Sequence, residues 1–121
     1  MLLISGWSDP IFAPEDLIRW YGLLDHDTRA STGAGADNFA RLFLAPGMTH
    51  CGGGPSLDDA DTLTALTDWV EKKRAPSFLV ARGNAFPGQS RPLCPYPQFA
   101  VYQGPGEGAD ARDYVCKAPK A

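Results

Sequence analysis

Short apolar segments alternate with longer amphipathic segments along the first two thirds of this 121-residue chain. The continuous apolar run at 2–4 suits a strand that is buried on both faces, and the segments at 39–45 and 78–82, rich in Phe and Leu, are also expected to be strands. The intervening segments, from Pro14 to about 25–27 and from about 61 to 74, have apolar residues at helical spacing. The order strand, helix, strand, helix, strand is typical of right-handed βαβ units. It predicts an α/β fold with a mainly parallel sheet and flanking helices.

The polar and the proline-rich stretches predict where the regular elements stop. Residues 28–38 are polar and rich in glycine, and residues 83–97 contain several prolines, so both are expected to be loops. Two short strands are expected at 98–102 and 113–117. For the second helix, the candidate N-caps are Asp58, Asp59 and Asp61, and Leu63, Leu66 and Val70, flanked by Trp69, fall at helical spacing.

Composition restricts the class of protein further. The length suits one domain or a piece of one, and 44% hydrophobic with 21% charged residues predicts a packed core. A net charge of −3 with scattered basic residues argues against a nucleic-acid partner. The longest apolar run has four residues, so neither a membrane span nor a signal peptide is expected in this sequence.

Two loops follow the first two predicted strands, GWSDP at 6–10 and PGMTHC at 46–51. Since ligands bind at the carboxyl ends of parallel strands, Asp9 and His50 are candidate site residues. A carboxylate that orients an imidazole lets the other ring nitrogen take a proton from a hydroxyl nucleophile. The order acid, helix, strand, histidine matches the end of the α/β-hydrolase order. In the alternative reading, Asp9 caps the turn before Pro10 and His50 is an ordinary hydrogen-bonded loop residue.

The other reactive side chains give weaker signals. His26 lies at the polar end of a predicted helix and is expected on the surface. The glycines at 52–54 do not match a phosphate-binding pattern, and no ligand spacing supports zinc at His50 and Cys51. A Cys51 nucleophile is disfavoured because adjacent side chains usually point in different directions. Three cysteines allow one internal disulfide and leave one thiol over.

Four segments, GWSDPIF, RLFLAPGMTHCGGGP, LTDWVEKKRAP and RPLCPYPQFAVYQG…DYVC, resemble the C-terminal part of the tannase and feruloyl esterase family of α/β-hydrolases. The resemblance covers nearly all of the chain. It implies that Asp9 is the acid and His50 the base of a catalytic triad. It also implies that Cys51 forms a disulfide with a cysteine beside the nucleophilic serine, absent from this sequence, and that Cys94 pairs with Cys116.

The same resemblance implies that residues 1–121 are the C-terminal fragment of a single α/β-hydrolase catalytic domain. None of the serines follows a cysteine or lies in G-x-S-x-G, so the nucleophile half and the lid are expected elsewhere. Calcium is expected in that lid, and no cofactor in this segment. The expected function is serine-type hydrolysis of phenolic-acid esters, feruloyl or galloyl, by a secreted or periplasmic parent, with this chain inactive alone. The alternative is a non-catalytic remnant or an assembly partner of an esterase. The oligomeric state is left open.

Overall fold

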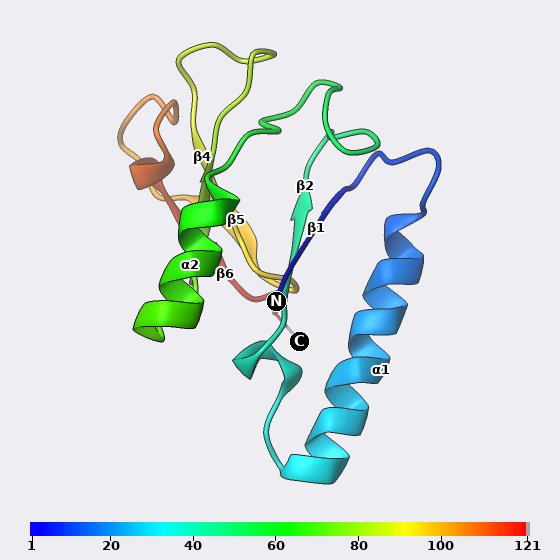
Figure 1. Cartoon of the computed structure of the whole chain (residues 1–121). Coiled ribbons are helices and arrows are strands. Elements are labelled where there is room, and N and C mark those ends of the chain that lie inside the picture. The colour runs from blue at the N-terminus through cyan, green and yellow to red at the C-terminus, as the bar shows by residue number, and fades with distance from the viewer. Residues whose placement is uncertain (121) are drawn as a thin grey trace.

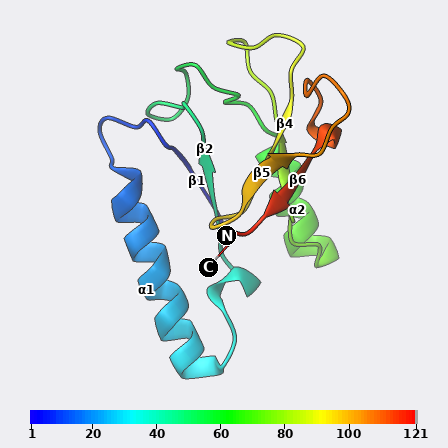
Figure 2. The ribbon, with the colours of Figure 1, turned by 180° about the vertical axis from the view of Figure 1, so that it is seen from behind.

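The computed structural model describes residues 1–120, and Figures 1 and 2 show their arrangement from two sides. Helices α1 and α2 stand on opposite sides of the strands β1 and β2, and the loops that follow these strands lie at one end of the molecule. Two 3₁₀ turns, Ala36–Asn38 and Ala111–Asp113, connect elements. The helices and strands are β1 Leu2–Gly6, α1 Pro14–Thr32, β2 Arg41–Ala45, α2 Thr62–Lys72, β3 Leu79–Ala81, β4 Arg91–Leu93, β5 Phe99–Tyr102 and β6 Tyr114–Lys117.

Strand β2 forms the centre of the molecule because both of its faces are covered. Leu42 and Leu44 pack with Tyr21 on the α1 side, whereas Phe43 and Ala45 pack on the α2 side. Leu42 and Phe43 are fully buried, and each such side chain stabilises the fold by roughly 1.5–3 kcal/mol. This two-sided burial explains why the sequence of the strand is apolar without alternation.

The described strands form three two-stranded sheets, and only the pair β1 and β2 is parallel, from Leu2↔Arg41 to Gly6↔Ala45. Strands β3 and β4 are antiparallel, and so are β5 and β6. The prediction of a mainly parallel sheet is therefore corrected for residues 1–120. A parallel pair needs a crossover of a dozen or more residues, whereas only nine residues, 82–90, join β3 to β4. After this connection, β4 runs back beside β3. Strand β4 lies within residues 83–97, where the prolines had predicted a loop.

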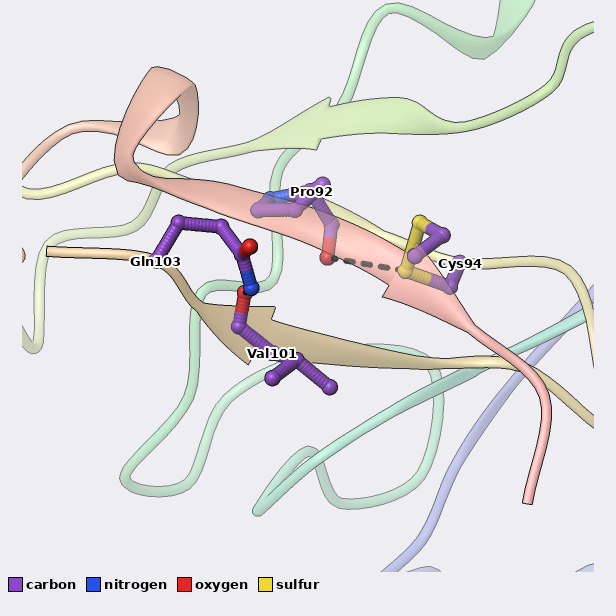
Figure 3. Close-up of a disulfide and its surroundings, with 5 residues drawn as sticks. Pro92, Cys94, Val101 and Gln103 are labelled. Atoms are coloured by element: carbon purple, nitrogen blue, oxygen red, sulfur yellow. Dashed lines mark hydrogen bonds between the residues drawn. A yellow bond between two sulfur atoms is a disulfide. The ribbon is translucent and has the colours of Figure 1, made fainter. Parts of the chain in front are cut away.

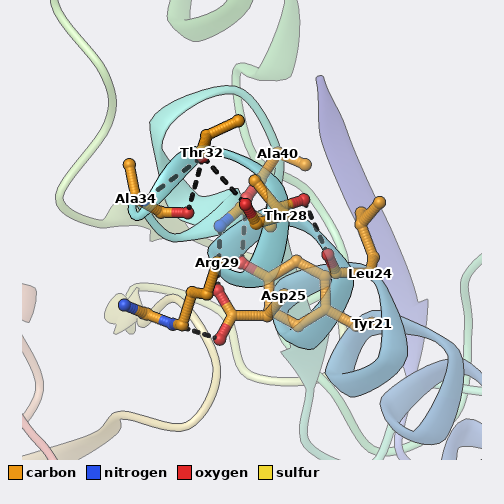
Figure 4. Close-up of polar contacts among 9 residues, drawn as sticks. Tyr21, Leu24, Asp25, Thr28, Arg29, Thr32, Ala34 and Ala40 are labelled. Carbon is orange, nitrogen blue, oxygen red and sulfur yellow. Dashed lines mark hydrogen bonds and ion pairs between the residues drawn. The ribbon is translucent and has the colours of Figure 1, made fainter.

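Helix α1 continues about one and a half turns past the end predicted at residues 25–27. The Asp25 carboxylate accepts a hydrogen bond from the Arg29 side chain at 2.7 Å (Figure 4). It also accepts one from the Ala36 backbone at 2.8 Å. Serine and threonine hydroxyls in these turns donate to carbonyls four residues earlier, so their polar groups are bonded within the helix. The helix ends when Gly33 donates to the Arg29 carbonyl. The acidic–basic pair and the glycine were the overlooked sequence signals.

The N-cap of α2 is Asp61, whose carboxylate accepts a hydrogen bond from the Thr64 backbone at 3.0 Å. This cap is one of the three predicted candidates. A side-chain cap of this kind contributes about 1 kcal/mol to stability. Neither Asp58 nor Asp59 caps the helix, and Asp58 instead contacts the glycine-rich loop described below.

The apolar residues that fall at helical spacing in α2 face outward. Leu63, Leu66 and Val70 are 75%, 37% and 62% exposed. The helix contacts the core through Ala65, and the Arg41 guanidinium lies 5.4 Å from the centre of the half-buried Trp69 ring. Within residues 1–120, no helix has the length and apolarity needed to cross a membrane.

A disulfide joins Cys94, directly after β4, to Cys116 in β6, and Figure 3 shows it beside the β5–β6 hairpin. This is the pair that the family resemblance implies. The bond closes a loop with a sequence separation of 22, and such a loop contributes about 3 kcal/mol by restricting the unfolded chain. The disulfide joins β6 of the hairpin to the segment that follows β4. This segment also pairs with β2, through the isolated bridge between Phe43 and Pro95.

Candidate active site

Backbone hydrogen bonds join the loop after β1 to the loop after β2. Trp7 donates to the Ala45 carbonyl and Ser8 donates to the Met48 carbonyl, both at 3.0 Å. The absence of a side chain at Gly6 permits this approach, because a Cβ there would lie 2.6 Å from the Met48 carbonyl carbon. Two loops that are 40 residues apart in sequence are thus held side by side at the carboxyl ends of neighbouring parallel strands.

Asp9 lies in the first of these loops, and its side chain is only 5% exposed. One carboxylate oxygen accepts hydrogen bonds from the backbone of Ile11 at 2.8 Å and Phe12 at 3.0 Å. The other oxygen bonds to the His50 ring at 3.0 Å. The bond to His50, followed by that to Phe12, lowers the pKa of Asp9 from 3.8 to about 2, although burial opposes the shift. Asp9 is therefore ionised at neutral pH.

His50 lies in the second loop with its side chain 37% exposed. Since ionised Asp9 can only accept, the His50 Nδ1–H must donate to Asp9 Oδ2. In the neutral ring this leaves Nε2 without a proton, in the form that a general base requires. The Phe12 ring lies 5.3 Å from the imidazole centre and covers part of it. The structure thus brings together both predicted site residues.

The glycine-rich segment after His50 closes on itself. Gly52, Gly53 and Gly54 all have positive φ, and the Thr49 hydroxyl donates to the Gly52 carbonyl at 2.6 Å. The Asp58 carboxylate accepts a hydrogen bond from the Gly53 backbone at 2.8 Å. These bonds fix the loop that carries His50, and the positive φ angles of the three glycines allow its tight turn. Sequence reasoning missed this role of Asp58 because an aspartate before a helix also fits a cap.

Cys51 carries a free thiol, and its sulfur lies 3.6 Å from His50 Nε2. The argument that adjacent side chains cannot meet is therefore wrong here. Cys51 has a φ of 58°, a left-handed backbone conformation that turns its side chain back to the imidazole. Asp9, His50 and Cys51 form a continuous line of contacts, carboxylate to imidazole to thiol.

The remaining candidates stay outside this cluster. His26 is exposed and its ring lies 3.2 Å from the Asp27 carboxylate, on the surface as its sequence position suggests. Across residues 1–120, no three His, Cys, Asp or Glu side chains gather to hold a metal ion. Phe12 was overlooked as a neighbour of the imidazole. Its position three residues after Asp9, in the turn that Asp9 organises, was the available signal.

The family model described as tannase and feruloyl esterase matches residues 1–117. The chain is 42% identical over 125 residues to a mono(2-hydroxyethyl) terephthalate hydrolase of Piscinibacter sakaiensis, covering 98% of this chain and 20% of that protein. It is 38% identical over 122 residues to a probable feruloyl esterase of Arthroderma benhamiae, covering 96% and 22%.

Solved structures agree with the sequence comparisons. The crystal structure of feruloyl esterase B from Aspergillus oryzae superposes with a TM-score of 0.71 and 28% identity, covering 96% of this chain and 26% of that one. The chain thus spans about a fifth to a quarter of the proteins it matches.

Proposed function

We propose that this chain, which belongs to the tannase and feruloyl esterase family, supplies the acid and the base of the catalytic triad of a serine-type carboxylic ester hydrolase. The proposed substrates are esters of phenolic acids, feruloyl or galloyl. The observation that carries the proposal is the 3.0 Å hydrogen bond between Asp9 and His50 at the ends of two neighbouring parallel strands. The named activities of the relatives, all ester hydrolysis, support it.

In the proposed reaction, His50 Nε2 takes the proton of a serine hydroxyl as that oxygen attacks the ester carbonyl. The imidazolium then gives the proton to the departing alcohol, which leaves an acyl-enzyme. Water hydrolyses the acyl-enzyme with the same base. Asp9 keeps the imidazole in the tautomer with Nδ1 protonated and stabilises the positive charge that forms on the ring.

The serine belongs, in this proposal, to a part of the protein outside the given sequence. Residues 1–121 are then the C-terminal fragment of one α/β-hydrolase domain. Cys51 would form a disulfide with a cysteine next to that serine, because its exposed thiol already lies at the base. Such a bond holds nucleophile and base together, where small displacements reduce the rate strongly. With Cys94–Cys116, it favours an oxidising compartment, secreted or periplasmic.

A chimera tests the proposal. The segment of the Piscinibacter sakaiensis relative that matches this chain is replaced by residues 2–117, and hydrolysis of mono(2-hydroxyethyl) terephthalate, methyl ferulate and methyl gallate is measured. We expect hydrolysis that falls by about 10³-fold or more in His50→Ala and Asp9→Asn. The matched control is His26→Ala, since the exposed His26 ring pairs with its neighbour Asp27 and not with Asp9.

Two results would contradict the proposal. The first is a folded chimera whose hydrolysis survives His50→Ala. The second is equal loss in His26→Ala and His50→Ala, which would indicate instability and not loss of a base. The 121-residue chain alone is expected to show no hydrolysis that depends on His50, because the proposal places the nucleophile elsewhere.

A second candidate function follows from the 3.6 Å contact between the Cys51 sulfur and His50 Nε2. In this candidate, Cys51 itself is the nucleophile, His50 is its base and Asp9 orients the ring, as in Cys–His hydrolases. Alkylation with iodoacetamide distinguishes the two. Rapid alkylation at pH 6 that slows in His50→Ala supports a thiolate nucleophile, whereas slow alkylation that is the same in both chains supports the serine proposal.

A further inference from the structure

A cavity of about 420 Å³ lies between the two site loops and the disulfide-linked hairpin. Its walls are mainly apolar and include four aromatic rings, those of Trp7, Phe86, Phe99 and Tyr114. The apolar residues that line it include Leu44, Pro46 and Pro55. A cavity of this size accommodates a small organic molecule with one ring.

One charged residue, Arg91 of β4, lines this cavity among the residues that the structure describes. Its guanidinium donates to the Ser90 carbonyl at 2.8 Å and to the Gln89 side chain at 3.1 Å. It also lies 4.5 Å from the centre of the Tyr114 ring. Gln89 and Tyr114 line the cavity too, which places the guanidinium at its wall.

The charge of Arg91 is not balanced nearby. In residues 1–120, no carboxylate lies within 4.0 Å of its guanidinium, although other arginines such as Arg29 and Arg112 are paired. Two of its five N–H groups bond to neutral oxygens, and the other three have no protein acceptor in the described part of the chain. A half-buried cation of this kind favours an anionic ligand, because a carboxylate pairs with the planar guanidinium through two parallel bonds.

We propose that this cavity binds a small aromatic carboxylate, with the ring among the apolar walls and the carboxylate on Arg91. The stacked Tyr114 and the bond to Gln89 hold the guanidinium in place, so little ordering is needed on binding. The site involves neither Asp9 nor His50 directly. The proposal is therefore independent of the proposed esterase function, and binding measured without any turnover tests it.

The experiment is a titration of the ¹⁵N-labelled chain with benzoate, followed through the indole signals of its three tryptophans. Benzamide is the neutral probe of the same shape, and acetate is an anion without a ring. Trp7 lines the cavity, whereas Trp20 lies on α1 and Trp69 on α2, so they act as internal references. We expect saturable shifts of Trp7 with benzoate, about tenfold weaker binding of benzamide, and no Trp7 shift with acetate.

Two variants separate charge from shape. Arg91→Gln should abolish the preference for benzoate over benzamide, while Arg112→Gln, at an exposed arginine paired with Asp110, should leave it unchanged. Ala100→Leu keeps the charge but fills part of the cavity, and should weaken both ring-bearing probes. Equal binding of benzoate and benzamide by the unmodified chain would overturn the proposal, whether or not a variant folds. Unchanged benzoate binding in folded Arg91→Gln, or equal shifts at all three tryptophans, would also overturn it.

Discussion

The substitution Gly6→Ala tests how the fold creates the acid–base pair. An added Cβ would lie 2.6 Å from the Met48 carbonyl carbon and 2.7 Å from the Thr49 carbonyl oxygen. Both are backbone atoms, so no flexible side chain can move aside to make room. The two loops must separate by about 1 Å, and displacements of this size cost about 10²-fold in rate when they separate catalytic groups.

The structure sets the size of the expected effects. Forcing atoms into a packed site destabilises a protein by about 1–3 kcal/mol, and a clash with backbone belongs toward the upper end. Because the His50 bond is the first cause of the low Asp9 pKa, separating the loops should raise that pKa from about 2 toward 3.8. In the chimera described above, Gly6→Ala should lower kcat/KM by about 10²-fold.

The assay combines urea unfolding with an NMR titration of the Asp9 carboxyl carbon. The matched control is Gly22→Ala, since Gly22 lies in α1 and a Cβ there meets no atom within 4 Å. The control should be more stable than the original chain by about 0.5–1 kcal/mol, as alanine is the better helix former. If Gly6→Ala left the Asp9 pKa at about 2 and the unfolding free energy unchanged, the close approach of the loops would not be what assembles the pair.

Three further predictions concern stability. The pKa of Asp9 is lower in the folded chain, so its contribution to stability is present above about pH 4 and is lost as the pH falls from about 4 to 2. The unfolding free energy of Asp9→Asn should therefore depend less on pH over this range than that of the original chain. The same pH dependence in both chains would contradict this prediction. Replacing Cys94 and Cys116 together by serine should cost about 3 kcal/mol in urea unfolding, and a loss below 1 kcal/mol would show that the closed loop matters little. Asp61→Ala should lower the unfolding free energy by about 1 kcal/mol, whereas Asp59→Ala, which removes no cap, should change it by less than half as much.

The sequence predicted the strands and helices that bring the site together. Two apolar-rich segments, followed by the loops that carry Asp9 and His50, were enough to place these two residues at one edge of a sheet. This worked because β2 is buried on both faces, and such burial leaves a clear apolar pattern.

The pairing of the later strands could not be predicted in the same way. Strand β4 contains Pro92 and lies in a stretch whose composition indicated a loop. The pairing of β4 with β3 depends on where this stretch turns back toward β3. The outward stripe of α2 shows a different limit. Leu63, Leu66 and Val70 have the spacing of a core-facing stripe, but spacing does not say which side of a helix the rest of the chain covers.

Within the site, the contact between Cys51 and His50 depends on a single backbone torsion. Left-handed conformations are uncommon for residues other than glycine, so the sequence argued against the contact that the structure contains. The positions of Phe12 and Asp58 also depend on turn geometry, which composition does not specify.

The measurement that tests the central claim most directly is the ¹⁵N NMR spectrum of the His50 ring in the folded chain at a pH where the ring is neutral. The account predicts that Nδ1 carries the proton and Nε2 is bare, because the Nδ1–H donates to ionised Asp9. It also predicts that Asp9→Asn shifts the ring toward the other tautomer. A proton on Nε2 in the original chain, or a ring tautomer that is the same in both chains, would contradict the assignment of Asp9 and His50 as the acid and base of an esterase.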